Sequence, residues 1–209
     1  MGDPGFLERF RAEARHAALV NHEGIASVFD YGEENGSAFL VMELVPGEAL
    51  STILERDGAI SADRTLDIVA QTALALQAAH SAGLVHRDIK PANIMLNRRG
   101  GEPDVVKVLD FGLVKALDDD KQAHLTAANS MTGTPLYMSP ESIQSPNTVD
   151  ARSDLYAVGA VGYYLLTGHP VFETNSIVEL CKQHVSTIPI PPSERLGAPV
   201  SKELEAVLL

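Results

Sequence analysis

The stretch that decides the fold runs from Leu84 to Leu96 and reads LVHRDIKPANIML. It brings an acid, a base and an amide within six positions of one another: Asp88, Lys90 and Asn93. The stretch lies between a helical pattern and a strand-like pattern. Functional side chains are often carried by such connecting segments, which a rigid scaffold positions. The sequence therefore predicts a catalytic loop here.

Two further motifs follow the first at short distance. Residues 105–112 read VVKVLDFG, a β-branched run that ends in Asp110, Phe111 and Gly112. Residues 133–141 read GTPLYMSPE. In this order and at this spacing, the three motifs resemble the catalytic-loop, DFG and APE-type motifs of the protein kinase family. Three ordered motifs are far more specific than any one of them.

The resemblance covers nearly the whole chain and implies both a fold and an activity. The expected fold is α+β and bilobal, with a mainly helical large lobe and an incomplete N-terminal lobe made of one helix and a two-strand hairpin. The expected activity is that of a bacterial-type serine/threonine protein kinase, which uses ATP and Mg²⁺ to phosphorylate Ser or Thr hydroxyls of a protein substrate. Residues 1–45 would be the remnant of the small lobe, and residues 46–209 the large lobe.

The composition limits the classes of partner. The 209 residues carry a net charge of −12, so the long-range field repels nucleic acid and anionic membranes. The single cysteine, Cys181, excludes an internal disulfide framework and fits a reducing compartment. No apolar run approaches the ~18 residues of a spanning helix, and the first residues lack a signal-peptide pattern. We expect a cytoplasmic protein with no nucleic-acid partner and no membrane segment in this chain.

The N-terminal part predicts one helix and two strands. Apolar residues recur at three- and four-residue spacing over 6–20, which favours an amphipathic helix that carries Glu13. Strand-like runs at 25–31 and 38–44 flank an Asn-Gly pair, which is a strong hairpin signal.

The remainder predicts two long helices and several shorter elements. Residues 61–80 form a helix that Ser61 caps, and its apolar face would contain Leu66, Val69, Ala70, Ala73, Leu74 and Leu76. Residues 149–168 are apolar nearly all round, which predicts a buried central helix. Further along, the pattern predicts a helix at 175–185, an extended proline-rich loop at 188–192 and a helix from 201.

The resemblance assigns the chemistry to five residues. Asp88 would align the acceptor hydroxyl as a base, and Lys90 would face the γ-phosphate. Asn93 and Asp110 would offer oxygen ligands to Mg²⁺. Thr134 and Lys90 match the residues that serine/threonine members carry at these places. Taken singly, each is an ordinary loop acid, surface lysine or turn residue, and only the combination favours catalysis.

The resemblance also implies an ATP site beneath a hinge. Met42 would be the gatekeeper, and main-chain groups of Glu43 and Val45 would hydrogen-bond the edge of adenine. Met95 would form an apolar floor under the base. The metal ligand Asp110 would complete the site on the phosphate side.

Regulatory and structural roles follow from the same resemblance. Arg87 would sense a phosphate on the activation segment, where the candidate sites are Thr126, Ser130 and Thr132, with the two threonines favoured. Glu13 would pair with a strand lysine, as the corresponding glutamate does in the family. The structural residues would be His86 and Phe111, which stack; Gly112; Glu141 of the third motif; and Asp154, which accepts catalytic-loop amides.

Parts of the family pattern are absent from the sequence, so we expect a chain truncated at both ends. No glycine-rich loop precedes Glu13, and no lysine precedes Lys90. The helix from 201 stops before the arginine that would pair with Glu141. We therefore expect Glu141 to be buried without its partner, at a cost of about 3 to 5 kcal/mol. The small hairpin would also present an open edge for self-association.

Two alternatives stand beside the kinase hypothesis. The first is a pseudokinase or binding module without turnover, because the glycine-rich loop and the strand lysine are absent. The second is a gene fragment that does not fold on its own. The complete set of Asp88, Lys90, Asn93 and Asp110 favours the enzyme, since loss of catalysis usually erodes these residues as well.

Overall fold

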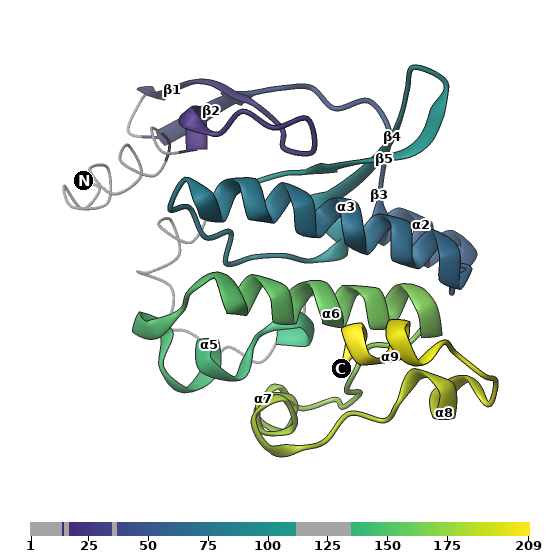
Figure 1. Cartoon of the computed structure of the whole chain (residues 1–209). Helices are drawn as coiled ribbons and strands as arrows, with labels where there is room; N and C mark the ends of the chain where they lie inside the picture. The colour runs from purple at the N-terminus through teal and green to yellow at the C-terminus, as the bar shows by residue number, and fades with distance from the viewer. Residues whose placement is uncertain (1–13, 15–16, 35–36, 112–134) are drawn as a thin grey trace.

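The computed structural model describes residues 14, 17–34, 37–111 and 135–209. This part contains a small sheet at one end, a second small sheet next to it, and a mainly helical remainder (Figure 1). The mixture confirms the expected α+β class. The residues of the predicted sites that lie outside the described part are Glu13, Gly112, Thr126, Ser130, Thr132 and Thr134.

The first sheet is the antiparallel pair of β1 (Val28–Glu34) and β2 (Ser37–Met42). The two predicted strands are thus confirmed, with a shift at the start of the first. Ile25 does not belong to β1, since it forms an isolated parallel bridge with Val108. Of the helix predicted at 6–20, residues 14 and 17–20 are described; residues 14 and 17–19 are helical, and Val20 lies outside the helix.

The second sheet has the order β3-β4-β5 and is antiparallel throughout. Its strands are β3 (Glu48–Ala49), β4 (Ile94–Arg99) and β5 (Glu102–Val108). A short helix that was not predicted, α2 (Leu50–Asp57), follows β3 directly. Gly47 precedes β3 with a φ of 143°, and a Cβ there would collide with the carbonyl oxygen of Leu96. Only glycine allows this close approach of the two chain segments.

The core lies around two long helices, α3 (Ala62–Ser81) and α6 (Ala151–Thr167), which pack against each other (Figure 1). Ser61 caps α3 by accepting a hydrogen bond from the Arg64 amide, as predicted. Asp150 caps α6, and Gly168 ends it in a left-handed conformation. The prediction of a buried central helix at 149–168 is confirmed, because most of α6 is buried, including a fully buried tyrosine, Tyr163.

The apolar face predicted for α3 is wrong in part. Leu66 and Leu74 are 47% and 57% exposed, and Ala70 is exposed as well. Threonines take their place toward the core: Thr72 is buried and satisfies its hydroxyl by donating to the Ile68 carbonyl of its own helix at 2.7 Å. The buried face of α3 consists of Thr65, Ile68, Val69, Thr72, Ala75, Leu76 and Ala79.

Shorter elements follow on either side of α6. Before it lie η3 (Pro135–Tyr137), α5 (Pro140–Gln144) and η4 (Pro146–Thr148). After it come α7 (Ile177–Ser186), α8 (Pro192–Leu196) and α9 (Lys202–Leu208). The loop predicted at 188–192 ends one residue early, because Pro192 begins α8. A proline suits the first turn of a helix, where its missing N–H is not needed.

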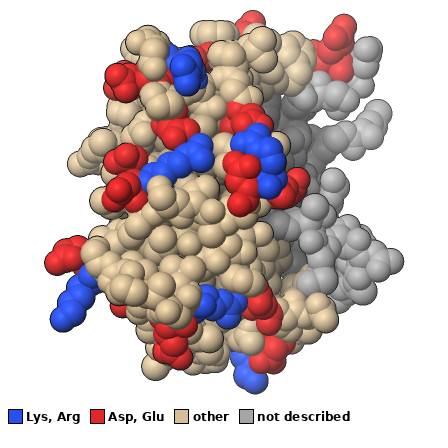
Figure 2. Space-filling view, turned by 90° about the vertical axis from the view of Figure 1, so that its right-hand side faces the viewer, with Lys and Arg blue, Asp and Glu red and all other residues tan. Residues whose placement is uncertain are grey.

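The surface carries both signs of charge. Figure 2 shows acidic and basic side chains interspersed on one face of the molecule. Among the described residues, the exposed ion pairs include Arg56 with Glu48 at 2.6 Å and Arg152 with Asp150 at 2.8 Å. None of the helices in the described part is both long and apolar enough to cross a membrane.

Candidate active site

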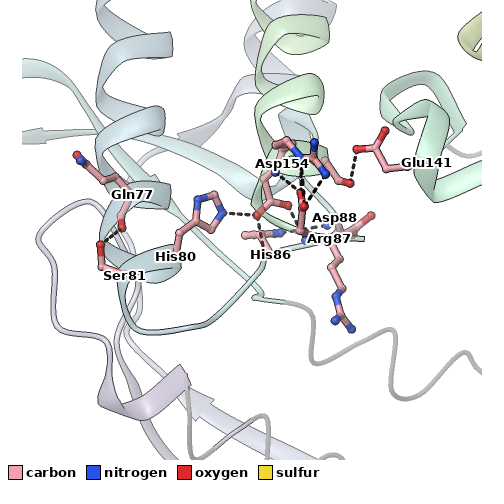
Figure 3. A network of polar contacts seen from close by, with 11 residues as sticks. Gln77, His80, Ser81, His86, Arg87, Asp88, Glu141 and Asp154 are labelled. Carbon is pink, nitrogen blue, oxygen red and sulfur yellow. Dashed lines mark hydrogen bonds and ion pairs between the residues drawn. The ribbon is translucent and has the colours of Figure 1, made fainter. Parts of the chain in front are cut away.

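A buried carboxylate holds the segment that follows α3. Asp154, near the start of α6, is 1% exposed and accepts hydrogen bonds from the main-chain amides of His86 and Arg87, both at 2.8 Å (Figure 3). Its Oδ2 also lies 2.7 Å from Nε2 of His80, in the last turn of α3. Arg87 has a positive φ of 65°. These contacts fix an unusual backbone turn between the two core helices, immediately before Asp88.

His86 links this segment to the end of β5. Its ring is fully buried, with Nε2 2.7 Å from the Leu109 carbonyl, and it packs on Phe111 with ring centroids 4.6 Å apart. The amide of Asp88 donates to Nδ1 at 3.2 Å. Burial lowers the pKa of His86, although the nearby Asp154 carboxylate opposes the effect. Because Nδ1 accepts the Asp88 amide and Nε2 faces a carbonyl oxygen, the hydrogen bonds assign the ring proton to Nε2.

Asp88 is held by two side chains of the same segment. The Lys90 ammonium lies 2.7 Å from Oδ2 of Asp88. The side-chain amide of Asn93, which ends η1 (Pro91–Asn93), donates to the Asp88 carbonyl at 2.8 Å and to Oδ2 at 3.1 Å. Both side-chain contacts fall on the same carboxylate oxygen. Within the described residues, Oδ1 of Asp88 is left for another partner.

Asp110 lies next to this group through a main-chain contact. The Leu109 amide donates to the Asn93 carbonyl at 2.9 Å, which joins the end of β5 to η1. Asp110 follows with a positive φ of 54°, an uncommon conformation for a residue other than glycine. The structure thus brings together four of the five predicted catalytic residues, whereas the fifth, Thr134, lies outside the described part.

The side-chain oxygens of Asn93 and Asp110 are the type of ligand that a hard cation such as Mg²⁺ takes together with phosphate oxygens. The amide nitrogen of Asn93 is directed at Asp88, so its amide oxygen takes no part in these two hydrogen bonds. Mg²⁺ usually takes one or two carboxylates and completes its shell with substrate phosphates and water. The described residues contain no cluster of three or more acidic, His or Cys side chains that could hold a metal ion.

The predicted hinge lies where β2 ends. Met42 is the last residue of β2, and the Glu43 amide donates to the Ser27 carbonyl at 2.8 Å. Met95 is a half-buried residue of β4. The Glu43 carboxylate contacts the Lys107 ammonium at 2.6 Å, and this hydrogen bond is the main cause that lowers the pKa of Glu43.

The expectation that Glu141 is buried without a partner is wrong. The residue is half-buried rather than fully buried, and its Oε1 accepts a hydrogen bond from the Ser153 hydroxyl at 2.6 Å (Figure 3). Burial alone would raise its pKa, but hydrogen bonds from Ser153, its own amide and Ser139 outweigh burial and lower it. A charge that is partly solvated and hydrogen-bonded does not carry the cost expected for a buried, unpartnered one.

Two residues of this region were missed from the sequence. His80 contacts Asp154 from α3, and Lys107 contacts Glu43 from β5. A signal for Lys107 existed, because it is the single charged residue in the apolar run at 105–109. A lysine in such a run is rarely buried unless it is paired.

Comparison with known proteins places the chain in a family. Residues 3–207 match the protein kinase domain. The chain belongs to the protein kinase family. Similar kinases include the serine/threonine-protein kinase PknB of Mycolicibacterium smegmatis, which is 44% identical over 99% of this chain, and pkn3 of Myxococcus xanthus, 44% identical over the whole chain. PknA of Mycobacterium tuberculosis is 43% identical over 99% of the chain.

The kinase fold is also found among solved structures. The chain superposes on Rad53, crystallised in complex with AMP-PNP, with a TM-score of 0.74 and 27% identity, over 96% of this chain and 49% of that one. The expected kinase-like fold is thereby confirmed. The present kinase chain spans only 33% to 47% of the length of the three bacterial relatives named above.

Proposed function

We propose that this chain is a protein serine/threonine kinase domain that transfers the γ-phosphate of ATP to Ser or Thr hydroxyls of a protein. The observation that carries the proposal is the arrangement of Asp88 between Lys90 and Asn93, with Asp110 tied to Asn93 through Leu109. The bacterial relatives named serine/threonine-protein kinases support it. No observation on the described residues favours the alternative of a binding module without turnover.

In the proposed reaction, Asp88 orients the acceptor hydroxyl. Oδ1, which neither Lys90 nor Asn93 occupies, accepts the hydroxyl hydrogen bond and then the proton as the oxygen attacks the γ-phosphorus. Lys90, 2.7 Å from the other oxygen, reaches the space in front of the carboxylate and offsets negative charge on the transferring phosphoryl group. ADP is the leaving group. Most of the catalytic effect is thus positioning and charge compensation.

ATP and Mg²⁺ are the proposed cofactors. Asn93 and Asp110 would hold the metal through their side-chain oxygens, and Mg²⁺ when bound neutralises charge on the phosphates. The adenine would lie under the hinge, against Met42 and Met95. The carbonyl of Glu43 and the amide of Val45 would hydrogen-bond the edge of the base.

Two residues bear on the acceptor type, and four on regulation. Lys90 and Thr134 support Ser or Thr acceptors. A phosphate on Thr126 or Thr132, or on Ser130, would gain charge-assisted hydrogen bonds from Arg87.

The experiment that tests the function is transfer of labelled γ-phosphate from ATP with Mg²⁺ to a basic protein or to the chain itself. Asp88→Asn should abolish the signal, because the amide cannot accept the proton. Asp67→Asn, the same change at an exposed position of α3, should leave it intact. Absence of transfer by the folded wild-type chain, or equal transfer by Asp88→Asn, would contradict the proposal.

Three further features belong to the same proposal. The small lobe would end at residue 45, where the chain leaves the hinge. A cytoplasmic location is supported by the single cysteine.

Self-association through the β1–β2 sheet is supported by the exposure of Phe29 (67%) and Val41 (43%). Light scattering should then give a mass above that of the monomer, and a monomeric mass at high concentration would exclude it.

A further inference from the structure

Lys107 is a buried lysine that carries no role in the function proposed above. It lies in β5 between Val106 and Val108, and its side chain is 8% exposed. Its ammonium contacts Oε2 of Glu43 at 2.6 Å and the carbonyl oxygen of Ile25 at 3.1 Å. Burial of an ammonium is costly unless such partners compensate it. Both partners come from segments more than sixty positions earlier in the chain, so the lysine joins β5 to the region of the hinge.

Glu43 is fixed at both its main chain and its side chain. Its amide donates to the Ser27 carbonyl at 2.8 Å, and its carboxylate accepts hydrogen bonds from the Ser27 amide at 3.2 Å and from Lys107. The main-chain carbonyl takes no part in these contacts. The residue is thus held from one side by a pair of reciprocal bonds to Ser27 and by one charged bond to Lys107.

The second partner of Lys107 belongs to the same rigid junction. The Val108 amide donates to the Gly24 carbonyl at 2.8 Å, and the Ala26 amide donates to the Val108 carbonyl at 2.9 Å. Ile25 therefore lies beside Val108, the last residue of β5, which precedes Asp110 by two positions. Lys107 stands where the segment 24–27, the hinge residue Glu43 and the strand leading to Asp110 meet.

We propose that Lys107 is a positioning residue for the nucleotide, which acts through Glu43 to hold the Glu43 carbonyl where it accepts a hydrogen bond from the 6-amino group of adenine. The inference rests on the proposed function, in which Glu43 lies at the edge of adenine. This role differs from a general contribution to stability. An ion pair that only stabilises the fold would not change the relative affinity for two purine nucleotides. Loss of Lys107 loosens the group that reads the amino substituent.

The test compares two nucleotides that differ at that substituent. Dissociation constants for ATP and for inosine triphosphate, which carries an oxygen in place of the 6-amino group, are measured with Mg²⁺ on the wild type, Lys107→Met and Lys107→Arg. For Lys107→Met we expect the affinity for ATP to fall about tenfold and that for inosine triphosphate to change much less, so the preference for ATP collapses. Lys107→Arg keeps the charge and should restore most of the preference. In kinetics, KM for ATP should rise while kcat changes little.

Two further variants serve as controls for Lys107→Met. Lys182→Met, the same substitution at an exposed lysine of α7, should behave as the wild type. If Lys107→Met does not fold, Glu43→Gln weakens the same contact at a residue that is 30% exposed and should reduce the preference for ATP in the same direction. An unchanged preference in the folded variant would overturn the inference. A wild type that binds neither nucleotide would instead overturn the proposed function.

Discussion

The side chain of Asn93 holds Asp88 at two points, its main-chain carbonyl at 2.8 Å and its carboxylate at 3.1 Å. One amide therefore restrains both the backbone and the side chain of the proposed base. Because Asn93 is buried and its carbonyl also accepts the Leu109 amide, the restraint extends to the end of β5. Asp88 and Asp110 are thus kept in a fixed relation by the residue that stands between them.

Replacement of Asn93 should reduce phosphate transfer more than stability. In Asn93→Ala the donor to Asp88 and the metal-facing oxygen are both lost, so we expect kcat to fall about a hundredfold or more. Asn147→Ala, at an exposed position of η4, is the matched control and should keep the wild-type rate. Rates are measured by labelled phosphate transfer at saturating ATP and Mg²⁺. A reduction below threefold would argue against the role of Asn93.

Asp154 should contribute strongly to the free energy of unfolding. Asp154→Ala leaves the main-chain amides of His86 and Arg87 without their acceptor, and we expect a loss of about 3 kcal/mol. Asp150→Ala removes the cap of the same helix and an exposed ion pair with Arg152, and it should cost about 1 kcal/mol. Urea unfolding measures both, with unchanged slope if the denatured state is unaffected. Equal losses for the two variants would contradict the anchoring role.

His184 should make the chain less stable in acid. Its ring is buried, with Nδ1 2.6 Å from the Tyr156 hydroxyl, and burial lowers its pKa from 6.5 to about 4, although the Pro135 carbonyl opposes this. Between these two values the unfolded chain binds more protons than the folded one. The stability that the neutral ring provides is therefore complete above pH 6.5 and is lost as the pH falls toward 4.

The measurement is the free energy of unfolding of wild type and His184→Gln at pH 7 and pH 5. His184 should account for about 2 kcal/mol of the loss between these values, which the glutamine variant should not show. An NMR titration of the ring protons gives an independent check, with a midpoint expected near 4. Identical pH profiles for the two proteins would show that the ring is not held neutral.

Two glycines of α6 should respond in opposite ways to alanine. A Cβ on Gly162 would lie 2.5 Å from Cδ2 of Leu208 and 2.8 Å from Cγ2 of Val69, so Gly162→Ala should cost about 1 to 3 kcal/mol. A Cβ on Gly159 has its nearest neighbour at 3.6 Å. Gly159→Ala should be neutral or stabilise by up to about 1 kcal/mol, through the better helix propensity of alanine. Thermal or urea unfolding of both variants distinguishes them, and a shift of the same sign would count against the packing.

Local signals account for most of what the sequence predicted. The cap at Ser61 and the apolar character of α6 act within a few residues, and the structure has both helices where they were expected. In the closely spaced motif from Asp88 to Asn93, the side chains likewise contact one another. The wrong assignments have two causes: the Thr72 hydroxyl is satisfied locally, by the Ile68 carbonyl one turn earlier, and Glu141 finds Ser153 in another helix. Hydrophobicity patterns carry no information about such partners.

The contact between Lys107 and Ile25 spans 82 positions of the chain, which has a consequence for the order of folding. Helices such as α3 and the hairpin of β1 and β2 form from neighbours in sequence, and these elements assemble rapidly. The junction at the hinge instead requires closure of a long loop, whose entropy is lost before any contact compensates it. A nascent chain cannot make this junction until Val108 has left the ribosome. The junction at the hinge is therefore expected to assemble later than α3 and the β1–β2 hairpin, whose residues all precede Val108.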